Sequence, residues 1–87
     1  MTTTQEDIKN WFNKAQKGNC NYLLVACDTF DYGDYPLGFK SLEDLKERFN
    51  NPHPMEIFME CYDLSLDLDE QLNERRSWHP SKKELER

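Results

Sequence analysis

The fold is decided by residues 22–35, which read YLLVACDTFDYGDY. The stretch begins as an apolar run, and its length, its aromatic Tyr22 and its β-branched Val25 favour a strand over a helix. Apolar side chains point to both faces of this strand, which is typical of a strand in the middle of a sheet. The second half alternates acidic with aromatic residues, and we expect function to lie there.

The residues before this strand predict a helix. A capping box pairs Thr3 with Glu6 or, in a second register, Thr4 with Asp7. An apolar stripe follows at helical spacing, and Gly18 ends the element. The stripe consists of Ile8, Trp11, Phe12 and Ala15.

A turn and a second strand are expected after the acidic-aromatic segment. Residues 31–34 (DYGD) are a turn signal in which Gly33 is free to take a positive φ. Residues 35–39 would then form a short strand, paired with the first as a hairpin. Pro36 cannot donate a ladder hydrogen bond, so this strand either lies at the edge of the sheet or does not form.

The clearest strand signal covers residues 55–63, where two sets of side chains alternate. The odd set is Met55, Ile57, Met59 and Cys61, and the even set is Glu56, Phe58, Glu60 and Tyr62. We expect the odd set to face the core and the half-acidic even set to face water.

Two further helices are predicted. A capping box at Ser41 begins one helix, which the NNPHP segment (50–54) ends. A capping box at Asp67 begins another, which we expect to last to about Trp78, because Pro80 stops it.

These elements predict one α+β domain over residues 1–87. The order is α-β-β-α-β-α, with a small three-stranded, mainly antiparallel sheet and helices packed on its apolar face. Residues 80–87 either form a last helical turn or are frayed.

Charge excludes one class of partner. The net charge is −6, and residues 1–72 carry 14 acids against 6 bases. An acidic body is a poor ligand for phosphate backbones, so no direct nucleic-acid binding is expected. It suits a protein partner with a basic surface, or serves only solubility.

Other features point to a cytoplasmic protein. The three cysteines are odd in number and form no CxxC pair, which is typical of a reducing compartment. No run approaches the length of a membrane span, and residues 1–8 lack the features of a signal peptide. We expect no cofactor, because the chain has no glycine-rich phosphate loop and no metalloprotease or nucleophile-elbow motif.

Two strings resemble a group of small proteins encoded in phages and prophages. They are CDTFDYGDYP (27–36) and MECYDLSLDLDEQLNERRSWH (59–79), which together make up 31 of the 87 residues. In that group a CDT-F/W-DYxDYP motif precedes a segment of the type MEVYDLSMDIEEQLNExRAxH. This chain departs from the pattern at Gly33, where Glu is common, and at Leu37 and Gly38, where strand residues are common.

The resemblance implies a context rather than a mechanism. Small acidic phage proteins are often accessory proteins, and many antagonise host defence systems, including CRISPR effectors. The resemblance therefore implies an anti-CRISPR-like inhibitor acting in the cytoplasm of the host cell, by analogy only.

An interaction surface is our preferred interpretation of the acidic-aromatic segment. Tyrosine is enriched at protein interfaces, and carboxylates beside it can pair with Arg or Lys of a basic partner. Such a surface would occupy a nucleic-acid-binding site on that partner without any enzymatic activity. We expect the contact to be made by Asp28, Phe30, Asp31, Tyr32, Asp34 and Tyr35, with Glu56 and Glu60 extending the charge.

Three alternatives stay open. Asp28, Asp31 and Asp34 would serve a small metal-dependent enzyme or sensor if they converged, with Asp63 at a neighbouring strand end. A homodimer would join through the exposed aromatics or through a sheet edge. Contact of a C-terminal helix face with nucleic acid is disfavoured by the acidic body. That face comprises Arg75, Arg76, Trp78 and His79.

Overall fold

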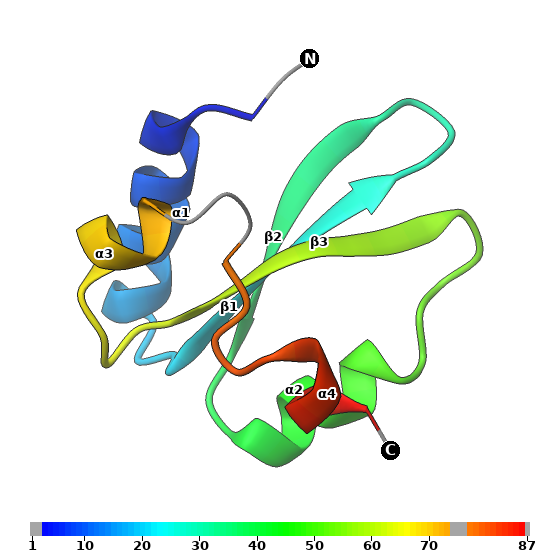
Figure 1. Ribbon diagram of the computed structural model, residues 1–87. Coiled ribbons are helices and arrows are strands. Elements are labelled where there is room, and N and C mark those ends of the chain that lie inside the picture. The colour runs from blue at the N-terminus through cyan, green and yellow to red at the C-terminus, as the bar shows by residue number, and fades with distance from the viewer. Residues whose placement is uncertain (1–2, 74–76, 87) are drawn as a thin grey trace.

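An antiparallel sheet with strand order β2-β1-β3 forms the centre of the computed structural model, which describes residues 3–73 and 77–86 (Figure 1). Its strands are β1 (Tyr22–Asp28), β2 (Gly33–Phe39) and β3 (Glu56–Asp63). The central place of β1 confirms what its two-sided apolar pattern predicts. The second strand does form, and it carries Pro36 at an edge of the sheet.

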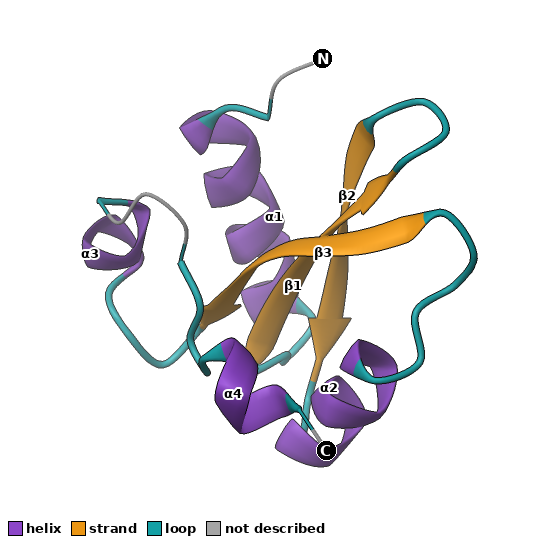
Figure 2. Ribbon diagram, turned by 45° about the vertical axis from the view of Figure 1, so that its right-hand side comes forward, coloured by secondary structure: helices purple, strands orange, loops and turns teal. Residues whose placement is uncertain are grey.

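Helices cover both faces of this sheet (Figure 2). They are α1 (Gln5–Lys17), α2 (Leu42–Phe49), α3 (Leu68–Leu72) and α4 (Lys82–Leu85). Side chains of α1 and α3 pack on one face, and those of α2 and α4 pack on the other. The α+β class and the predicted element order are confirmed, but the helices lie on two apolar faces instead of one.

Each face has its own core because the side chains of β1 alternate between them. The core under α1 contains Ile8, Phe12, Leu23, Val25 and Tyr62. The core under α2 and α4 contains Leu24, Leu45, Cys61 and Leu85. An aromatic group borders the second core, where the Phe49 ring lies 5.7 Å from that of Phe58 and 5.9 Å from that of Trp78.

The expected alternation of β3 is wrong at both ends. Met55 and Ile57 are exposed, whereas Glu56 and Tyr62 are buried. Tyr62 is buried because α1 covers the face of the sheet that was expected to be wet. Nearer the start of β3 the register shifts opposite Val25 and Ala26, where Glu60 and Phe58 are the partners and Met59 is extra. Such a bulge places the side chains that precede Met59 on the face of the sheet opposite to the one that strict alternation predicts.

The third helix is shorter than predicted, because α3 ends at Leu72 rather than near Trp78. The chain instead runs beside β3, where the Cys61 amide donates to the Ser77 carbonyl at 2.9 Å and the His79 amide donates to the Cys61 carbonyl at 3.0 Å. Trp78 thereby reaches the second core, which buries more of its ring than an exposed helix face would.

The C-terminal tail forms a helical turn, which was one of its two predicted states. Ser81 and Glu84 make a reciprocal capping box, and Leu85 is fully buried against α2. The tail therefore contributes to the second core.

Replacing Leu85 by Ala tests this contribution. We expect Leu85→Ala to lower the free energy of unfolding by about 2–5 kcal/mol, because it removes buried methyl groups and leaves a cavity. Urea denaturation followed by circular dichroism measures this change. The exposed Lys83→Ala on the same turn should stay within about 0.5 kcal/mol of the wild type. Equal stability of the two variants would mean that the tail is frayed.

Candidate functional site

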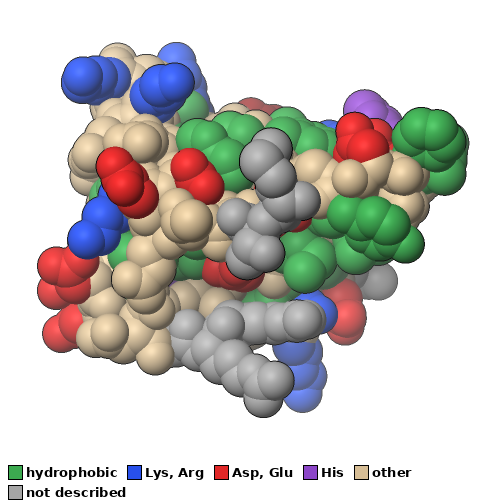
Figure 3. Space-filling model, turned by 90° about the horizontal axis from the view of Figure 1, so that it is seen from above, with side chains coloured by type: hydrophobic (Ala, Val, Ile, Leu, Met, Phe, Trp, Pro, Cys, Tyr) green, Lys and Arg blue, Asp and Glu red, His purple; other side chains and the backbone are tan. Residues whose placement is uncertain are grey.

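The large apolar side chains that the described residues expose fall into two groups at opposite ends of the sheet. Phe30, Tyr32, Met55 and Ile57 belong to one group, and Leu42 and Leu66 to the other. The first group lies where Asp28 pairs with both Gly33 and Glu56. We call residues 28–34 and 53–57 the sheet tip. Figure 3 shows apolar side chains gathered at the right-hand end, where the strands project, with acidic side chains beside them.

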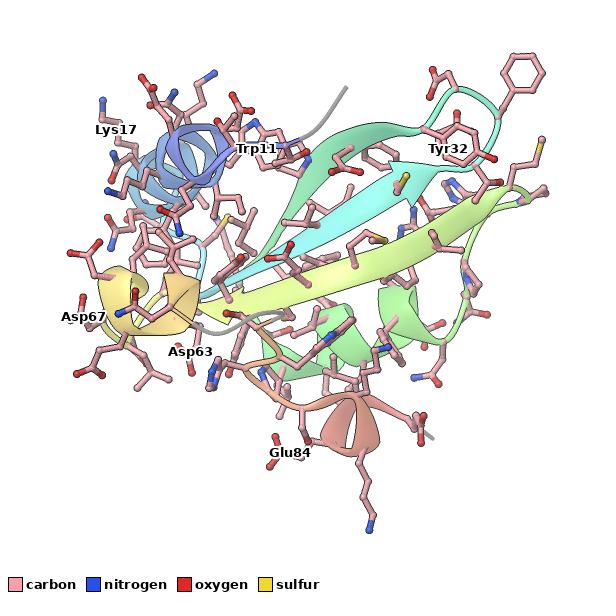
Figure 4. All side chains as sticks on the ribbon, turned by 45° about the horizontal axis from the view of Figure 1, so that its top comes forward. Trp11, Lys17, Tyr32, Asp63, Asp67 and Glu84 are labelled. Carbon is pink, nitrogen blue, oxygen red and sulfur yellow. The ribbon has the colours of Figure 1, made fainter. Side chains whose placement is uncertain are left out.

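A hydrogen-bonded turn holds the two aromatic rings of the tip outward. The Asp28 side chain accepts from the Phe30 amide at 2.8 Å, and its carbonyl accepts from the Tyr32 amide at 2.7 Å. The Asp31 side chain accepts from the Gly33 amide at 2.8 Å. Phe30 and Tyr32 stay 77% and 69% exposed (Tyr32 is labelled in Figure 4). Two of the predicted carboxylates therefore shape the turn that displays the rings.

The left-handed backbone of this turn is at Tyr32, with φ 58°, and not at Gly33 as expected. Met55 has φ 63° in the neighbouring loop. A positive φ is costly for a bulky side chain, and such residues cluster at functional sites. Both residues also expose most of their side chains. The tip thus holds two strained positions that present apolar groups to solvent.

The two loops of the tip are fastened together. The Thr29 amide and hydroxyl both donate to the Met55 carbonyl, at 2.7 and 3.0 Å. Ile57 lies next along β3, opposite Cys27. The sequence pattern did not place Met55 and Ile57 at the site, because the bulge that turns them outward has no signature in a strictly alternating run. The tip is therefore one connected surface.

The three aspartates do not converge. Asp28 and Asp31 accept the turn amides, and Asp34 accepts from the Thr3 hydroxyl before α1. Asp63 pairs with Tyr22 at the opposite end of β1, so its expected place beside Asp28 is wrong. Within residues 3–73 and 77–86, no group of three His, Cys, Asp or Glu side chains is placed to hold a metal ion.

Glu56 is buried, which corrects its expected place on a wet face. Its Oε2 lies 2.6 Å from Nη2 of Arg48 and accepts from the Tyr35 hydroxyl, and its Oε1 accepts from the His53 amide at 3.1 Å. Burial alone would raise the pKa of Glu56, but these hydrogen bonds lower it from 4.5 to about 2. Burial and the bond to Glu56 raise the pKa of Tyr35 to about 12.

The ion pair between the half-buried Arg48 and the buried Glu56 supports the tip from the side of α2. Arg48 belongs to α2, Tyr35 to β2 and Glu56 to the start of β3, so three elements meet at one carboxylate. Arg48 also lies over the Phe58 ring, 5.4 Å from its centroid. Tyr35 and Glu56 are therefore supports of the tip and not part of its displayed surface.

Glu60 does not extend the charge of Glu56. It lies opposite Val25, across the bulge, and accepts a hydrogen bond from the buried Tyr62 hydroxyl. The bulge places the two glutamates on different faces of the sheet. Their expected common acidic stripe is therefore wrong.

The tip is negative as well as apolar. Residues 28–34 and 53–57 contain four carboxylates and no Lys or Arg. Arg48 neutralises Glu56, which leaves the charges of Asp28, Asp31 and Asp34 at the tip. The arrangement can bind a surface that offers cations and an apolar area together.

The remaining sequence candidates lie elsewhere. Cys27 and Cys61 are buried; burial raises the pKa of both thiols, that of Cys61 to about 12, which disfavours the reactive thiolate. Arg75 and Arg76 lie outside the described residues. Trp78 packs in the second core, so the expected basic helix face is not formed with it.

Comparisons of the chain with protein-family models, with curated proteins and with solved structures find no match. None of the helices that the structure describes has the length and apolar character needed to cross a membrane.

The support of the tip by Glu56 predicts a pH dependence of stability. Since the pKa of Glu56 is lowered on folding, its contribution is complete above pH 4.5 and is lost as the pH falls toward about 2. Glu56→Gln should cost about 3 kcal/mol at pH 7, because it leaves the half-buried Arg48 without its partner charge. In this variant, the free energy of unfolding should fall less between pH 4.5 and about 2 than it does in the wild type.

Urea unfolding at a series of pH values measures both effects. Glu70→Gln, an exposed change of the same kind on α3, should leave the curve unchanged. The interpretation fails if Glu56→Gln follows the wild-type pH profile with only a constant offset.

Proposed function

We propose that this protein is a binding protein without catalytic activity, whose sheet tip docks on a basic, nucleic-acid-binding surface of a protein partner. The observation that carries the proposal is the exposure of Phe30, Tyr32, Met55 and Ile57 together at one end of the sheet. Exposed apolar groups that are contiguous and bordered by polar groups mark interaction sites on soluble proteins.

The charge of the tip defines the partner. Asp28, Asp31 and Asp34 belong to the same segment as Phe30 and Tyr32, and no Lys or Arg of the tip offsets their charge. Carboxylates in this arrangement attract Arg and Lys side chains, which are the groups that hold phosphates in a nucleic-acid site. The apolar centre then gives the contact an affinity that bare phosphates would not have.

The rigidity of the tip supports the same proposal. Its turn is closed by the Asp28 and Asp31 side chains, its loops are joined by Thr29, and the ion pair of Arg48 with Glu56 lies beneath it. A surface that is already ordered loses little conformational entropy on binding. A rigid, small aromatic surface is therefore well suited to compete with a nucleic acid for its site.

The biological setting proposed here comes from the resemblance to small phage and prophage proteins. In that setting the partner is a host defence complex, and the protein acts in the host cytoplasm as an anti-CRISPR-like antagonist. The charge and exposure of the tip fit such an inhibitor, whereas its identity as a phage protein rests on the two sequence strings alone.

A second copy of this chain is the alternative occupant of the tip. The same apolar group would be buried in a homodimer, but two tips of equal negative charge would then face each other. Light scattering on the purified protein separates the proposals, because a stable dimer at micromolar concentration would assign the tip to self-association.

Removing the two exposed rings tests the assignment of the tip. Phe30→Ser combined with Tyr32→Asn should weaken partner binding at least about thirtyfold, since aromatic anchors dominate interface energies. The fold should stay intact, because both rings are exposed and Asn tolerates a positive φ better than Tyr. The measurement is quantitative mass spectrometry of proteins captured from a host lysate by the immobilised variants.

The matched control removes two exposed apolar side chains from the other end of the sheet. Leu42→Ser with Leu66→Ser should capture the same proteins as the wild type. An excess of duplex DNA or RNA should displace these proteins. Undiminished capture by the Phe30 and Tyr32 variant, or capture that nucleic acid does not affect, would contradict the proposal.

Salt provides an independent test of the charge complementarity. Asp31→Asn keeps the oxygen that accepts the Gly33 amide but removes the charge. We expect it to weaken capture at about 0.1 M salt and to have little effect at about 1 M, where the screening length falls to about 3 Å. A surface plasmon resonance titration with the captured partner measures this. An Asp31→Asn effect of the same size at both salt concentrations would exclude an electrostatic role.

A further inference from the structure

The second exposed apolar group borders a pocket at the end of the sheet opposite the tip. The pocket has a volume of about 370 Å³, which lies in the range of small-molecule sites. Tyr22 and Trp78 line it with aromatic rings, and Leu42 and Leu66 line it with side chains that are 38% and 48% exposed. The pocket thus offers apolar contact that the fold itself leaves unused.

Two carboxylates give this pocket its charge. Asp63 at the end of β3 and Glu84 on α4 both line it, and both are labelled in Figure 4. Among the described residues that line the pocket none is a Lys or an Arg, and the lining also includes the ionisable side chain of His79. The Lys82 ammonium, which lies against the Trp78 ring, offsets one of these two charges, so the described residues at the pocket keep an excess of negative charge that favours a cation over an anion.

Local hydrogen bonds fix both carboxylates. Oδ1 of Asp63 accepts from the amide and the hydroxyl of Ser65, at 2.8 and 2.6 Å. Oε2 of Glu84 accepts from the Ser81 amide at 3.2 Å. A carboxylate oxygen has two acceptor directions, so both groups keep acceptor capacity for a ligand.

Trp78 already contacts a cation of the chain itself. The Lys82 ammonium lies 4.9 Å from the centroid of its ring. Indole is the aromatic group that cations bind best, and a planar guanidinium can stack on Tyr or Trp. Because Lys82 already lies against the indole of Trp78, the aromatic ring available to a planar ligand cation is that of Tyr22.

From these observations we infer that the pocket binds a small organic cation with a short aliphatic body, of the alkylguanidinium or alkylammonium class. The charged head would pair with Asp63 and Glu84, and the aliphatic body would lie against Leu42, Leu66 and the rings. This site does not depend on the function of the tip, because the seven residues of β1 separate the two by about 20 Å.

A titration with n-butylguanidinium, followed by the indole N–H signals in a two-dimensional NMR spectrum, tests the site. The chain has two tryptophans, of which Trp78 lines the pocket and Trp11, a residue of α1, packs against the other core. We expect a saturable shift at Trp78 with a dissociation constant of about 1 mM, which is typical of a fragment-sized ligand. The Trp11 signal should stay in place.

Matched probes and variants identify the cause of the shift. n-Butylurea has the same shape without the charge, and it should bind at least about fivefold more weakly. Asp63→Asn and Glu84→Gln keep the local hydrogen-bond acceptors, and each should weaken n-butylguanidinium binding about threefold. Glu70→Gln removes a charge outside the pocket and should have no effect.

Three results would overturn the inference. They are a Trp78 signal that does not shift or does not saturate in the millimolar range, equal affinity for n-butylurea, and unchanged affinity in the variant that combines Asp63→Asn with Glu84→Gln. None of them bears on the tip, since neither Asp63 nor Glu84 belongs to it.

Discussion

The structure depends on the burial of β1 from both sides. Leu23, Leu24, Val25, Ala26 and Cys27 are consecutive and all buried. Because strand side chains alternate, such a run needs a neighbouring strand on each edge and a cover on each face. The chain meets this need with α1 and α3 on one face and α2 and α4 on the other. Its short helices cannot cover the whole length of the sheet.

The uncovered part of the sheet is where the candidate site lies. Beyond the two cores, β1 ends at Asp28 and the chain closes a turn with its own carboxylates instead of with further packing. The ion pair between Arg48 and Glu56 fastens this end to α2. Burying such a pair contributes little net stability, but it fixes the geometry of the groups around it. The tip is consequently a rigid surface rather than a loose loop.

Local patterns in the sequence were sufficient to predict the elements and their order. Capping residues, apolar stripes and the two-sided run of β1 are all local signals, and α1, α2 and the place of β1 follow from them. The limits of α3 were not predictable in this way. The extended segment at Ser77 forms because the Cys61 amide donates a hydrogen bond to Ser77 and the Cys61 carbonyl accepts one from His79. Cys61 is distant from this segment in the sequence.

The candidate site was only partly predictable for the same reason. The exposure of Phe30 and Tyr32 agrees with the alternation of acidic and aromatic residues. The burial of Glu56 was not predicted, because its charge is compensated by Arg48 of α2. The alternating pattern of a strand carries no information on a partner in another element. Met55 and Ile57 were missed because the bulge at Met59 reverses the face of each side chain that precedes it.

The central claim is that the free protein displays an apolar tip beyond a sheet that is covered on both faces. The most direct measurement is the broadening of side-chain NMR signals by a soluble, neutral gadolinium chelate. The account predicts strong broadening for the side chains of Phe30, Tyr32, Met55 and Ile57, and almost none for Leu24, Val25 and Tyr62. If the signals of Phe30, Tyr32, Met55 and Ile57 in the monomeric protein were broadened as little as those of Leu24, Val25 and Tyr62, the claim would be contradicted.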